Sequence, residues 1–255
     1  MIKTPAEVEI MAEAGRLLAS VFIHLDAQPL LGMSTLEIDA LVEAYIVDTL
    51  HARPASKGQY GYAFTLNSSR NEVVCHGVPS ADEILKDGDI VNLDITLEKN
   101  GFIADSSKTY LIGDVAAPAK RLVRATCDAM WKGIRAVKPG ATLGDIGHAI
   151  EQHAKRNGYS VVRDYCGHGI GREMHEKPQV LHFGKPGTGL KLREGMVFTI
   201  EPMLNQGVRT VRTEDDGWTV VTTDRKLSAQ FEHTVAVTKT GVRVLTLRPE
   251  EWVAA

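Results

Sequence analysis

The sequence predicts an α+β fold built from two similar halves, on the basis of three observations. Helical periodicity and strand-like alternation occupy separate stretches, in the order helix, helix, strands, and then helix, helix, strands again. Such segregation is typical of α+β folds rather than of doubly wound sheets. The second helices read alike, with "GMSTLEIDALVEAYI" at 32–46 against "GATLGDIGHAIEQHA" at 140–154, a weak internal repeat. No Pro- or Gly-rich linker separates the halves, so we expect a single domain over 1–255.

The first half opens with a long amphipathic helix predicted over 5–28. Thr4 and Glu7 have the spacing of a capping box, and Pro5 occupies the first helical position. Apolar residues follow at helical spacing, namely Val8, Met11, Leu18, Phe22 and Leu25. A second helix begins at Ser34, which has the spacing of a capping box with Glu37. We expect its buried face to carry Leu41, Ala44 and Val47.

Short β-like runs broken by "NG" and "DG" fill residues 59–113, and the second half then repeats the order. A third helix follows Pro118 and stops at "KPG", residues 138–140. Its inward face is predicted to contain Leu122, Ala125, Ala129 and Ile134. A fourth helix begins at Thr142 and ends at Asn157-Gly158, a common C-terminal stop. Strands return until about residue 247.

Composition narrows the function classes. The chain has 255 residues, of which 44% are hydrophobic, and a formal net charge of -3 with a pI near 6.3. This charge argues against a membrane-surface or specific nucleic-acid-binding protein, since both usually carry a basic surplus. Three widely spaced cysteines indicate reduced thiols, and no apolar run approaches the length of a membrane span. The start of the chain has no apolar signal region, so we expect a cytoplasmic protein.

A predicted hairpin at 91–110 brings two acids together. Residues 91–98 alternate strictly, "KNG" forms the turn, and Asp94 and Asp105 fall on the same face of the hairpin. A type I′ turn would pair Thr96 with Asp105, whereas a type I turn with a G1 bulge would pair Asp94 with Asp105. At about 4 Å and an effective dielectric of about 20, the two charges repel by about 4 kcal/mol. Either the face is exposed and the charges are screened, or a cation lies between them.

Three further residues favour the cation. Glu201 and Glu232 each lie in an otherwise apolar strand, where each could still be an edge-strand charge, and His168 stands between two glycines. Glutamates are rarely buried unless they are paired or bound to a metal. Two aspartates, two glutamates and one histidine suit a dinuclear site for Mn, Fe, Co or Zn, because bridging carboxylates let five ligands hold two cations.

The chain resembles the type I methionine aminopeptidases, which have the pita-bread fold of two related α+β halves around a central metal site. The motifs that carry the resemblance are "NEVVCHGVP" at 71–79, "VNLDITLEKNGFIADSSKTY" at 91–110, "GHGIGREMHEKPQV" at 167–180, "FTIEPM" at 198–203 and "DGWTVVTTDRKLSAQFEHTV" at 216–235. They span most of the chain after residue 70, in matching order and spacing. The resemblance implies paired helices of two pseudo-twofold-related halves, packed on a curved antiparallel sheet.

The resemblance also implies two divalent cations per chain and a role for each ligand. Asp94 corresponds to the bidentate ligand of one metal, Asp105 and Glu232 to the bridging carboxylates, and His168 and Glu201 to the other metal's ligands. A bridging hydroxide would attack the first peptide carbonyl, with Glu201 as proton shuttle.

Residues outside the ligand set would handle the peptide. His76 and His175 correspond to the histidines that contact the scissile peptide and its tetrahedral intermediate. Tyr62 and Trp218 match positions that line the pocket for the first side chain. Met174 and Asn67 also belong to this group, but an aromatic residue and a cysteine are common at those two positions in the family. A small second residue should be preferred, since it passes near the metals.

The substrates implied are peptides and nascent proteins with an N-terminal methionine, and we expect a monomer that associates transiently with the ribosome. No Cys-rich extension precedes the first helix, and Glu201 and Glu232 are only 31 positions apart, which favours a compact bacterial subtype. The alternatives are a related X-Pro aminopeptidase or dipeptidase and a non-catalytic module of the same fold. The first usually has an extra N-terminal domain and the second usually lacks metal ligands.

Overall fold

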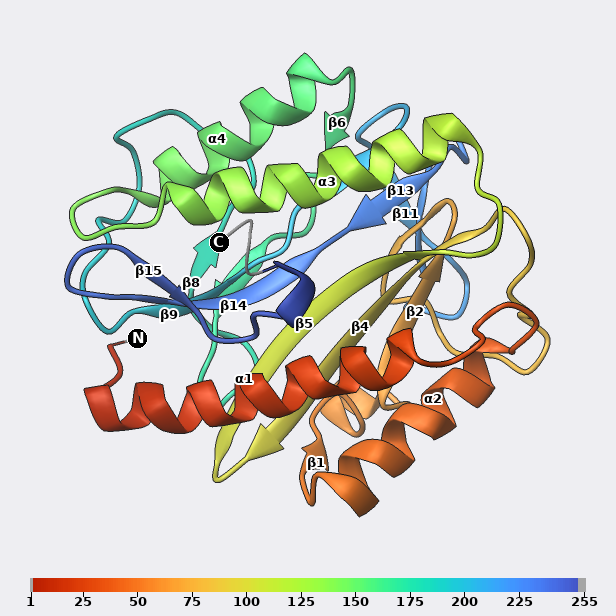
Figure 1. The fold of residues 1–255 in the computed structure, drawn as a ribbon. Helices are drawn as coiled ribbons and strands as arrows, with labels where there is room; N and C mark the ends of the chain where they lie inside the picture. Colours follow the sequence, from red (N-terminus) through yellow and green to blue (C-terminus); the bar gives the residue numbers. More distant parts are fainter. Residues whose placement is uncertain (1, 252–255) are drawn as a thin grey trace.

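The computed structural model describes residues 2–251 and places four α-helices against a curved sheet of antiparallel strands (Figure 1). The helices are α1 (Pro5–Asp26), α2 (Thr35–Ala44), α3 (Ala117–Arg135) and α4 (Leu143–Arg156). A π-helical turn, η1 (Tyr45–Thr49), continues α2, and two 3-10 turns are η2 (Gln59–Gly61) and η3 (Pro249–Glu251). The predicted α+β class is confirmed.

The central sheet has nine strands in the order β1-β4-β5-β14-β9-β7-β8, with β2 added on β4 and β15 on β14. These strands are β1 (Arg53–Pro54), β2 (Leu66–Arg70), β4 (Ile90–Lys99), β5 (Phe102–Leu111), β7 (Gly167–Gly169), β8 (Glu176–Val180), β9 (Val197–Ile200), β14 (Glu232–Val237) and β15 (Val242–Val244). Two three-stranded sheets flank it, one of β13 (Ser228–Gln230), β10 (Met203–Asn205) and β6 (Ser160–Val161), the other of β11 (Val211–Thr213), β12 (Val220–Thr222) and β3 (Val73–Cys75).

The helices begin where the sequence predicts them, because the predicted caps form. Thr4 with Glu7 and Ser34 with Glu37 make complete capping boxes, and Thr142 makes a third with Asp145. The predicted buried face of α2 is wrong, however. Its buried stripe is Ile38, Val42 and Ile46, whereas Ala44 and Val47 are exposed. Two apolar stripes run along this short helix, and helical periodicity alone cannot tell them apart. Packing against the sheet buries the stripe that was not predicted.

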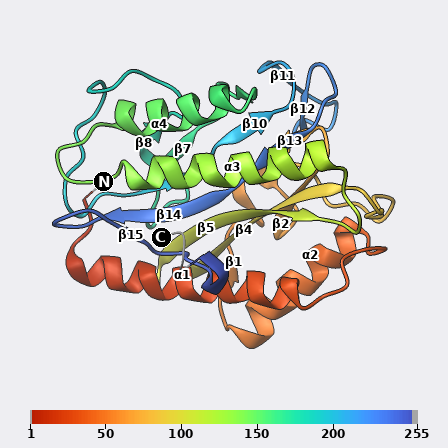
Figure 2. The same ribbon diagram turned by 45° about the horizontal axis from the view of Figure 1, so that its top comes forward.

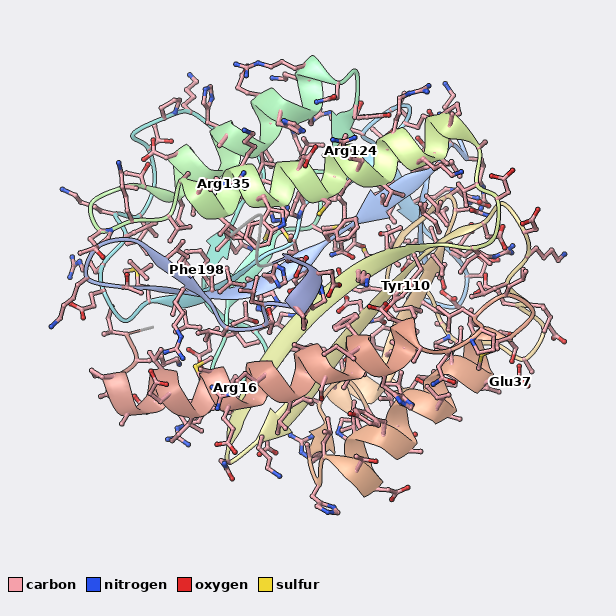
Figure 3. All side chains as sticks on the ribbon, viewed as in Figure 1. Arg16, Glu37, Tyr110, Arg124, Arg135 and Phe198 are labelled. Carbon is pink, nitrogen blue, oxygen red and sulfur yellow. The ribbon has the colours of Figure 1, made fainter. Side chains whose placement is uncertain are left out.

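Each half of the molecule has its own hydrophobic core between its helices and its strands. α1 and α2 cover β4 and β2 in the first half, while α3 and α4 cover β9 and β14 in the second (Figures 1 and 2). Phe198 lies inside the second core, and charged side chains such as Arg124 on α3 and Glu37 on α2 point away from the body of the protein (Figure 3).

The two halves meet where β5 lies beside β14, and this junction is here called the seam. Two cross-strand pairs are registered between these strands, Ser107 with Glu232 and Ser106 with His233. The seam therefore places Glu232 of the second half next to the strand that carries Asp105 of the first. These residues are 127 positions apart in the sequence, which is why no local pattern could predict the contact.

Candidate metal centre and substrate cleft

A cleft of about 300 Å³ collects the candidate residues from both halves. It contains the five predicted metal ligands, both predicted substrate histidines, Asn67 and Met174. Its remaining lining is Ser56, Cys75, Thr96, Tyr165, Cys166, Glu176, Gln179, Met203 and Gln230. Two predicted residues, Tyr62 and Trp218, do not line this cleft. The structure thus brings together predicted site residues that lie up to 165 positions apart in the sequence, from Asn67 to Glu232.

The hairpin of β4 and β5 fixes the positions of the two aspartates. Asn100 and Gly101 both have positive φ, 54° and 79°, as a type I′ turn requires. The register follows the first of the two predicted alternatives, with Thr96 opposite Asp105. Asp94 therefore lies diagonally across from Asp105 on the same face, and each of the two carboxyl groups acts on the pKa of the other.

Asp105, His168 and Glu232 form a compact potential metal site. One ligand atom from each lies within 4.8 Å of the others. His168 Nε2 is 3.7 Å from Asp105 Oδ2 and 3.5 Å from Glu201 Oε1. The other ring nitrogen, Nδ1, lies 3.0 Å from the carbonyl oxygen of Gly169, an acceptor, so Nδ1 carries the proton and Nε2 is bare. A lone pair on nitrogen thus faces two carboxylate oxygens.

Burial makes this carboxylate cluster electrostatically costly. It raises the pKa of Asp94 to about 6 and the pKa of Glu201 to about 8. Burial, and then the charges of neighbouring carboxylates, raise the pKa of Asp105 and of Glu232 well above the usual range. Asp105 Oδ1 and Glu232 Oε1 are buried without a hydrogen-bond partner. These unpaired oxygens and the bare imidazole nitrogen fit divalent cations, which would offset the repulsion and accept the lone pairs.

Glu201 is held by neighbours that the sequence analysis did not single out. Thr199 donates a hydrogen bond to Glu201 Oε1 at 2.7 Å, and its oxygen accepts one from the backbone N–H of His168 at 2.9 Å. Gln230 Nε2 lies 3.4 Å from Glu201 Oε2, and His182 Nε2 accepts from the Glu201 N–H at 3.2 Å. Thr199 could have been predicted only from strand alternation, which places it on the same face as Glu201. No local sequence pattern indicates that Gln230 or His182 contacts Glu201.

The glycines beside His168 serve strand packing. A Cβ atom on Gly167 would lie 2.5 Å from the carbonyl oxygen of Thr199, and one on Gly169 would lie 2.2 Å from that of Lys177. Neither glycine has the positive φ that side chains avoid. Strand β7 can therefore lie close to its neighbours only without side chains at these positions, and this approach sets the depth of the His168 ring in the cleft.

His76 and His175 enter the cleft from different elements. His76 has a left-handed backbone with φ of 57°, and its ring packs edge-on against Tyr165 at 5.3 Å between centroids. The ring of His175 lies 4.4 Å from that of His168. Burial lowers the pKa of His175, and burial together with the proximity of His175 lowers the pKa of His76. Both imidazoles are therefore neutral near pH 7, and each offers one N–H donor.

The four residues predicted to contact the first side chain lie in three different settings. Tyr62 and Trp218 pack edge-on at 5.0 Å, beside the cleft and not in its lining. Asn67 stands directly opposite Asp94 on the neighbouring strand, and its side chain hydrogen-bonds that carboxylate. Met174 lines the cleft and also packs with Phe102 and other apolar residues of a buried cluster.

Comparisons with known proteins agree with this geometry. The model of metallopeptidase family M24 matches residues 9–239. A methionine aminopeptidase of Escherichia coli (strain K12) is 48% identical over 254 residues, covering 100% of this chain and 96% of that protein. The crystal structure of a methionine aminopeptidase from Rickettsia prowazekii gives a TM-score of 0.94 at 47% identity, covering 97% of this chain and 99% of that one. A prolidase from Pyrococcus horikoshii OT3 shares the fold alone, with a TM-score of 0.77 at 23% identity over 63% of its length.

Proposed function

This chain belongs to metallopeptidase family M24 as a methionine aminopeptidase, and on that premise we propose how its residues remove an N-terminal methionine. The enzyme depends on divalent metal, as the family does. We propose that it holds two cations with Asp94, Asp105, His168, Glu201 and Glu232. The observation that carries this proposal is that the unprotonated Nε2 of His168 faces carboxylate oxygens of Asp105 and Glu201. In the same cluster, one oxygen each of Asp105 and Glu232 is buried without a hydrogen-bond partner.

Each ligand has a distinct part in this arrangement. Asp94 would hold one cation, His168 and Glu201 the other, and Asp105 and Glu232 both. This set of carboxylates with one imidazole accepts Co, Mn, Fe or Zn. Once bound, the cations would supply Lewis acidity, which would polarise the scissile carbonyl and lower the pKa of the attacking water far below that of bulk water, toward about 7.

Glu201 is the group that we propose to move the proton. Its carboxyl group is buried in the cleft, with Oε1 3.5 Å from His168 Nε2, where the attacking water would lie. The bonds from Thr199 and Gln230 hold its two oxygens in place. Glu201 would take a proton from the attacking water and pass it to the leaving amine of the second residue.

The two neutral histidines complete the reaction by donating hydrogen bonds. As the carbonyl becomes tetrahedral, negative charge grows on its oxygen, and a fixed N–H from His175 or His76 is worth more there than in the ground state. The free α-amine of the substrate would lie at the Asp94 end of the cleft, where Asn67 already orients the carboxylate. This restricts cleavage to the N-terminus.

Specificity is proposed to come from two features. Met174 lines the cleft and would offer a soft wall to an unbranched thioether, and the edge-on pair of Tyr62 and Trp218 would give a rigid aromatic wall to a methionine pocket that extends beside the cleft. The cleft of about 300 Å³ leaves little room beside the carboxylates, which favours a small second residue such as Gly, Ala or Ser.

The cellular setting follows from the same activity. The substrates are peptides with an N-terminal methionine. Within residues 2–251, no helix is long and apolar enough to cross a membrane. We further propose a cytoplasmic monomer folded as one unit over 1–255, which acts on nascent chains and associates transiently with the ribosome.

A paired metal and substrate assay tests this proposal. Metal content would be measured after titration with Mn²⁺, and turnover would be compared on Met-Ala-Ser and on X-Pro peptides. We expect two metals per chain and cleavage of the methionine peptide alone. One metal at full activity would refute the dinuclear site. Cleavage of X-Pro peptides would favour the prolidase-like alternative, and absence of both metal and turnover would favour a non-catalytic module.

A further inference from the structure

A buried ionic triad near the end of the described chain has no part in the proposed reaction. Its members are Arg248, Glu251 and His233, with exposed fractions of 1%, 8% and 0%. Arg248 Nη2 donates to Glu251 Oε1 at 2.7 Å, and Glu251 Oε2 lies 3.1 Å from His233 Nε2. Buried charges of this kind are rare and costly unless the structure uses them.

The triad lies on the seam between the two halves. His233 on β14 stands directly opposite Ser106 on β5. Arg248 Nη1 donates to Ser106 Oγ at 3.0 Å, and Ser106 Oγ donates in turn to the carbonyl oxygen of Glu232 at 2.7 Å. Arg248 therefore contacts β5 directly, and it reaches β14 through Glu251 and through His233 itself, whose Nε2 lies 3.4 Å from Arg248 Nη2.

The triad is also directly behind the metal centre. Successive side chains of a strand point to opposite faces of the sheet. Ser106 and His233 therefore point away from the face on which their neighbours Asp105 and Glu232 meet. The two proposed bridging carboxylates and the triad thus occupy opposite faces of the sheet at one position on the seam.

Helices from both halves enclose the triad on its own side. The Arg248 guanidinium lies 5.0 Å from the ring centre of Phe22 on α1, and the His233 ring lies 5.5 Å from that of Trp131 on α3. Figures 1 and 2 show the dark blue C-terminal turn lying between α1 and α3, over the junction of the two halves. The segment that ends the described chain thus contacts strands and helices of each half.

We propose that Arg248 is a positioning residue for the metal centre, holding β5 and β14 in the relative position that brings Asp105 and Glu232 together. The inference rests on the proposed metal site. Two registered pairs join these strands, so their alignment depends on side-chain bonds such as those of Ser106. A planar guanidinium suits this task, because its fixed fork bonds two partners at set angles. Glu251 balances its charge, so the triad adds no net charge behind the carboxylates.

The test measures metal binding in Arg248→Met, Arg248→Lys and Glu251→Gln. Mn²⁺ affinity would be measured by calorimetry, and the visible spectrum of the Co²⁺-loaded protein would report ligand geometry. We expect Arg248→Met to weaken Mn²⁺ binding about 10-fold to 100-fold, as loss of a group that orients metal ligands typically does, and to shift the Co²⁺ spectrum. Arg248→Lys should recover part of both. If Arg248→Met does not fold, Arg248→Lys and Glu251→Gln provide the test, and each should weaken Mn²⁺ binding and shift the Co²⁺ spectrum by a smaller amount.

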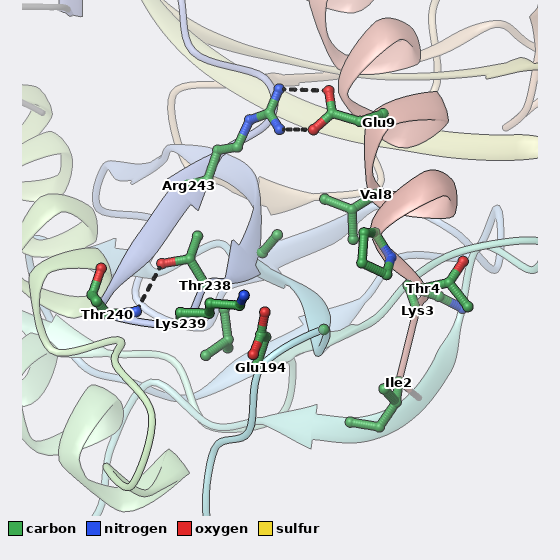
Figure 4. Close-up of a pocket in the computed structure, with 14 residues that line it drawn as sticks. Ile2, Lys3, Thr4, Val8, Glu9, Glu194, Thr238, Lys239, Thr240 and Arg243 are labelled. Atoms are coloured by element: carbon green, nitrogen blue, oxygen red, sulfur yellow. Dashed lines mark hydrogen bonds and ion pairs between the residues drawn. The ribbon is translucent and has the colours of Figure 1, made fainter.

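Two controls separate positioning from general stability. Arg243→Met removes the exposed ion pair with Glu9, two residues that line a separate hollow of about 650 Å³, and should leave metal affinity unchanged (Figure 4). Ile38→Val in the first core should lower the melting temperature without changing affinity or spectrum.

The outcomes distinguish this inference from the proposed function. If the folded Arg248 and Glu251 variants keep wild-type Mn²⁺ affinity and Co²⁺ spectra, the positioning role is refuted. If Asp105→Ala also binds metal like the wild type, the proposed metal site itself is wrong. If Ile38→Val weakens binding as much as Arg248→Met at a similar loss of melting temperature, the triad is merely structural.

Discussion

Removing the metal should make the stability of this protein fall as the pH rises above 6.5. Burial raises the pKa of Glu201 to about 8 in the folded protein, far above the ordinary value of 4.5 that it has in the unfolded chain. Between these two pH values, the folded state binds a proton that the unfolded chain has lost. Each such proton lowers the free energy of unfolding by about 1.4 kcal/mol per pH unit as the pH rises.

The buried histidines restrict the pH window in which this effect is seen alone. Burial lowers the pKa of His168 to about 4 and that of His182 to about 3, below the unfolded value of 6.5. The unfolded chain then binds the extra protons, so these groups make stability rise with pH up to about 6.5 and add nothing above it. From pH 6.5 to about 8, the pH dependence of stability therefore comes from the buried carboxyl groups, and the histidines no longer oppose it.

The expected size of the effect follows from one proton over that window. It is about 2 kcal/mol lost between pH 6.5 and 8, or about 4 to 8 °C in melting temperature for a chain of this length. The assay is urea unfolding at steps of half a pH unit, in EDTA and in saturating Mn²⁺. With metal bound the carboxylates are ionised throughout, so the slope should vanish. Stability that is flat or rising in EDTA between pH 6.5 and 8 would refute the reasoning, and Glu201→Gln should reduce the slope.

Three substitutions test individual residues. Asp105→Ala should abolish turnover and metal binding, because it removes a shared ligand from the carboxylate cluster; near wild-type activity with two metals bound would contradict the model. His175→Ala should lower kcat about 10²-fold to 10³-fold, since its hydrogen bond strengthens in the transition state, whereas a change in KM alone would make it a ground-state contact. Met174→Phe should keep Met-Ala cleavage and should discriminate more sharply against norleucine and Leu as the first residue. The change, measured as ratios of kcat/KM between these peptides, should be at most about 1 to 3 kcal/mol. Unchanged ratios would show that Met174 does not line the pocket.

The helices of this protein could be predicted from the sequence because their signals are local. A capping box such as Thr4 with Glu7 involves neighbours three positions apart, and it forms in the structure as expected. The placement of Asp94 and Asp105 on one face of the hairpin was also local, since both registers that the turn allows give it. The buried face of α2 was mispredicted because tertiary packing, not periodicity, selects between two apolar stripes.

What the sequence could not supply were contacts between distant strands. The strand order that places β14 beside β9 leaves no mark in either segment, so the contact of Gln230, just before β14, with Glu201, just after β9, could not be inferred. The family resemblance supplied the residues of the site, but not the reason for each. The glycines beside His168 illustrate this, since they serve the close packing of β7 against neighbouring backbone.

The position of the carboxylates on the seam has a consequence for the stability of the whole molecule. Asp105 belongs to one half and Glu232 to the other, and without cations their charges oppose the approach of β5 to β14. The same two residues would attract each other through a shared cation. Because the two halves have largely separate cores, metal binding should stabilise the seam more than either core. Amide hydrogen exchange near Ser106 and His233 should therefore slow on adding Mn²⁺ more than exchange within α2 or α4. Equal slowing everywhere would show that the halves unfold as one unit and that the metal does not act on the seam in particular.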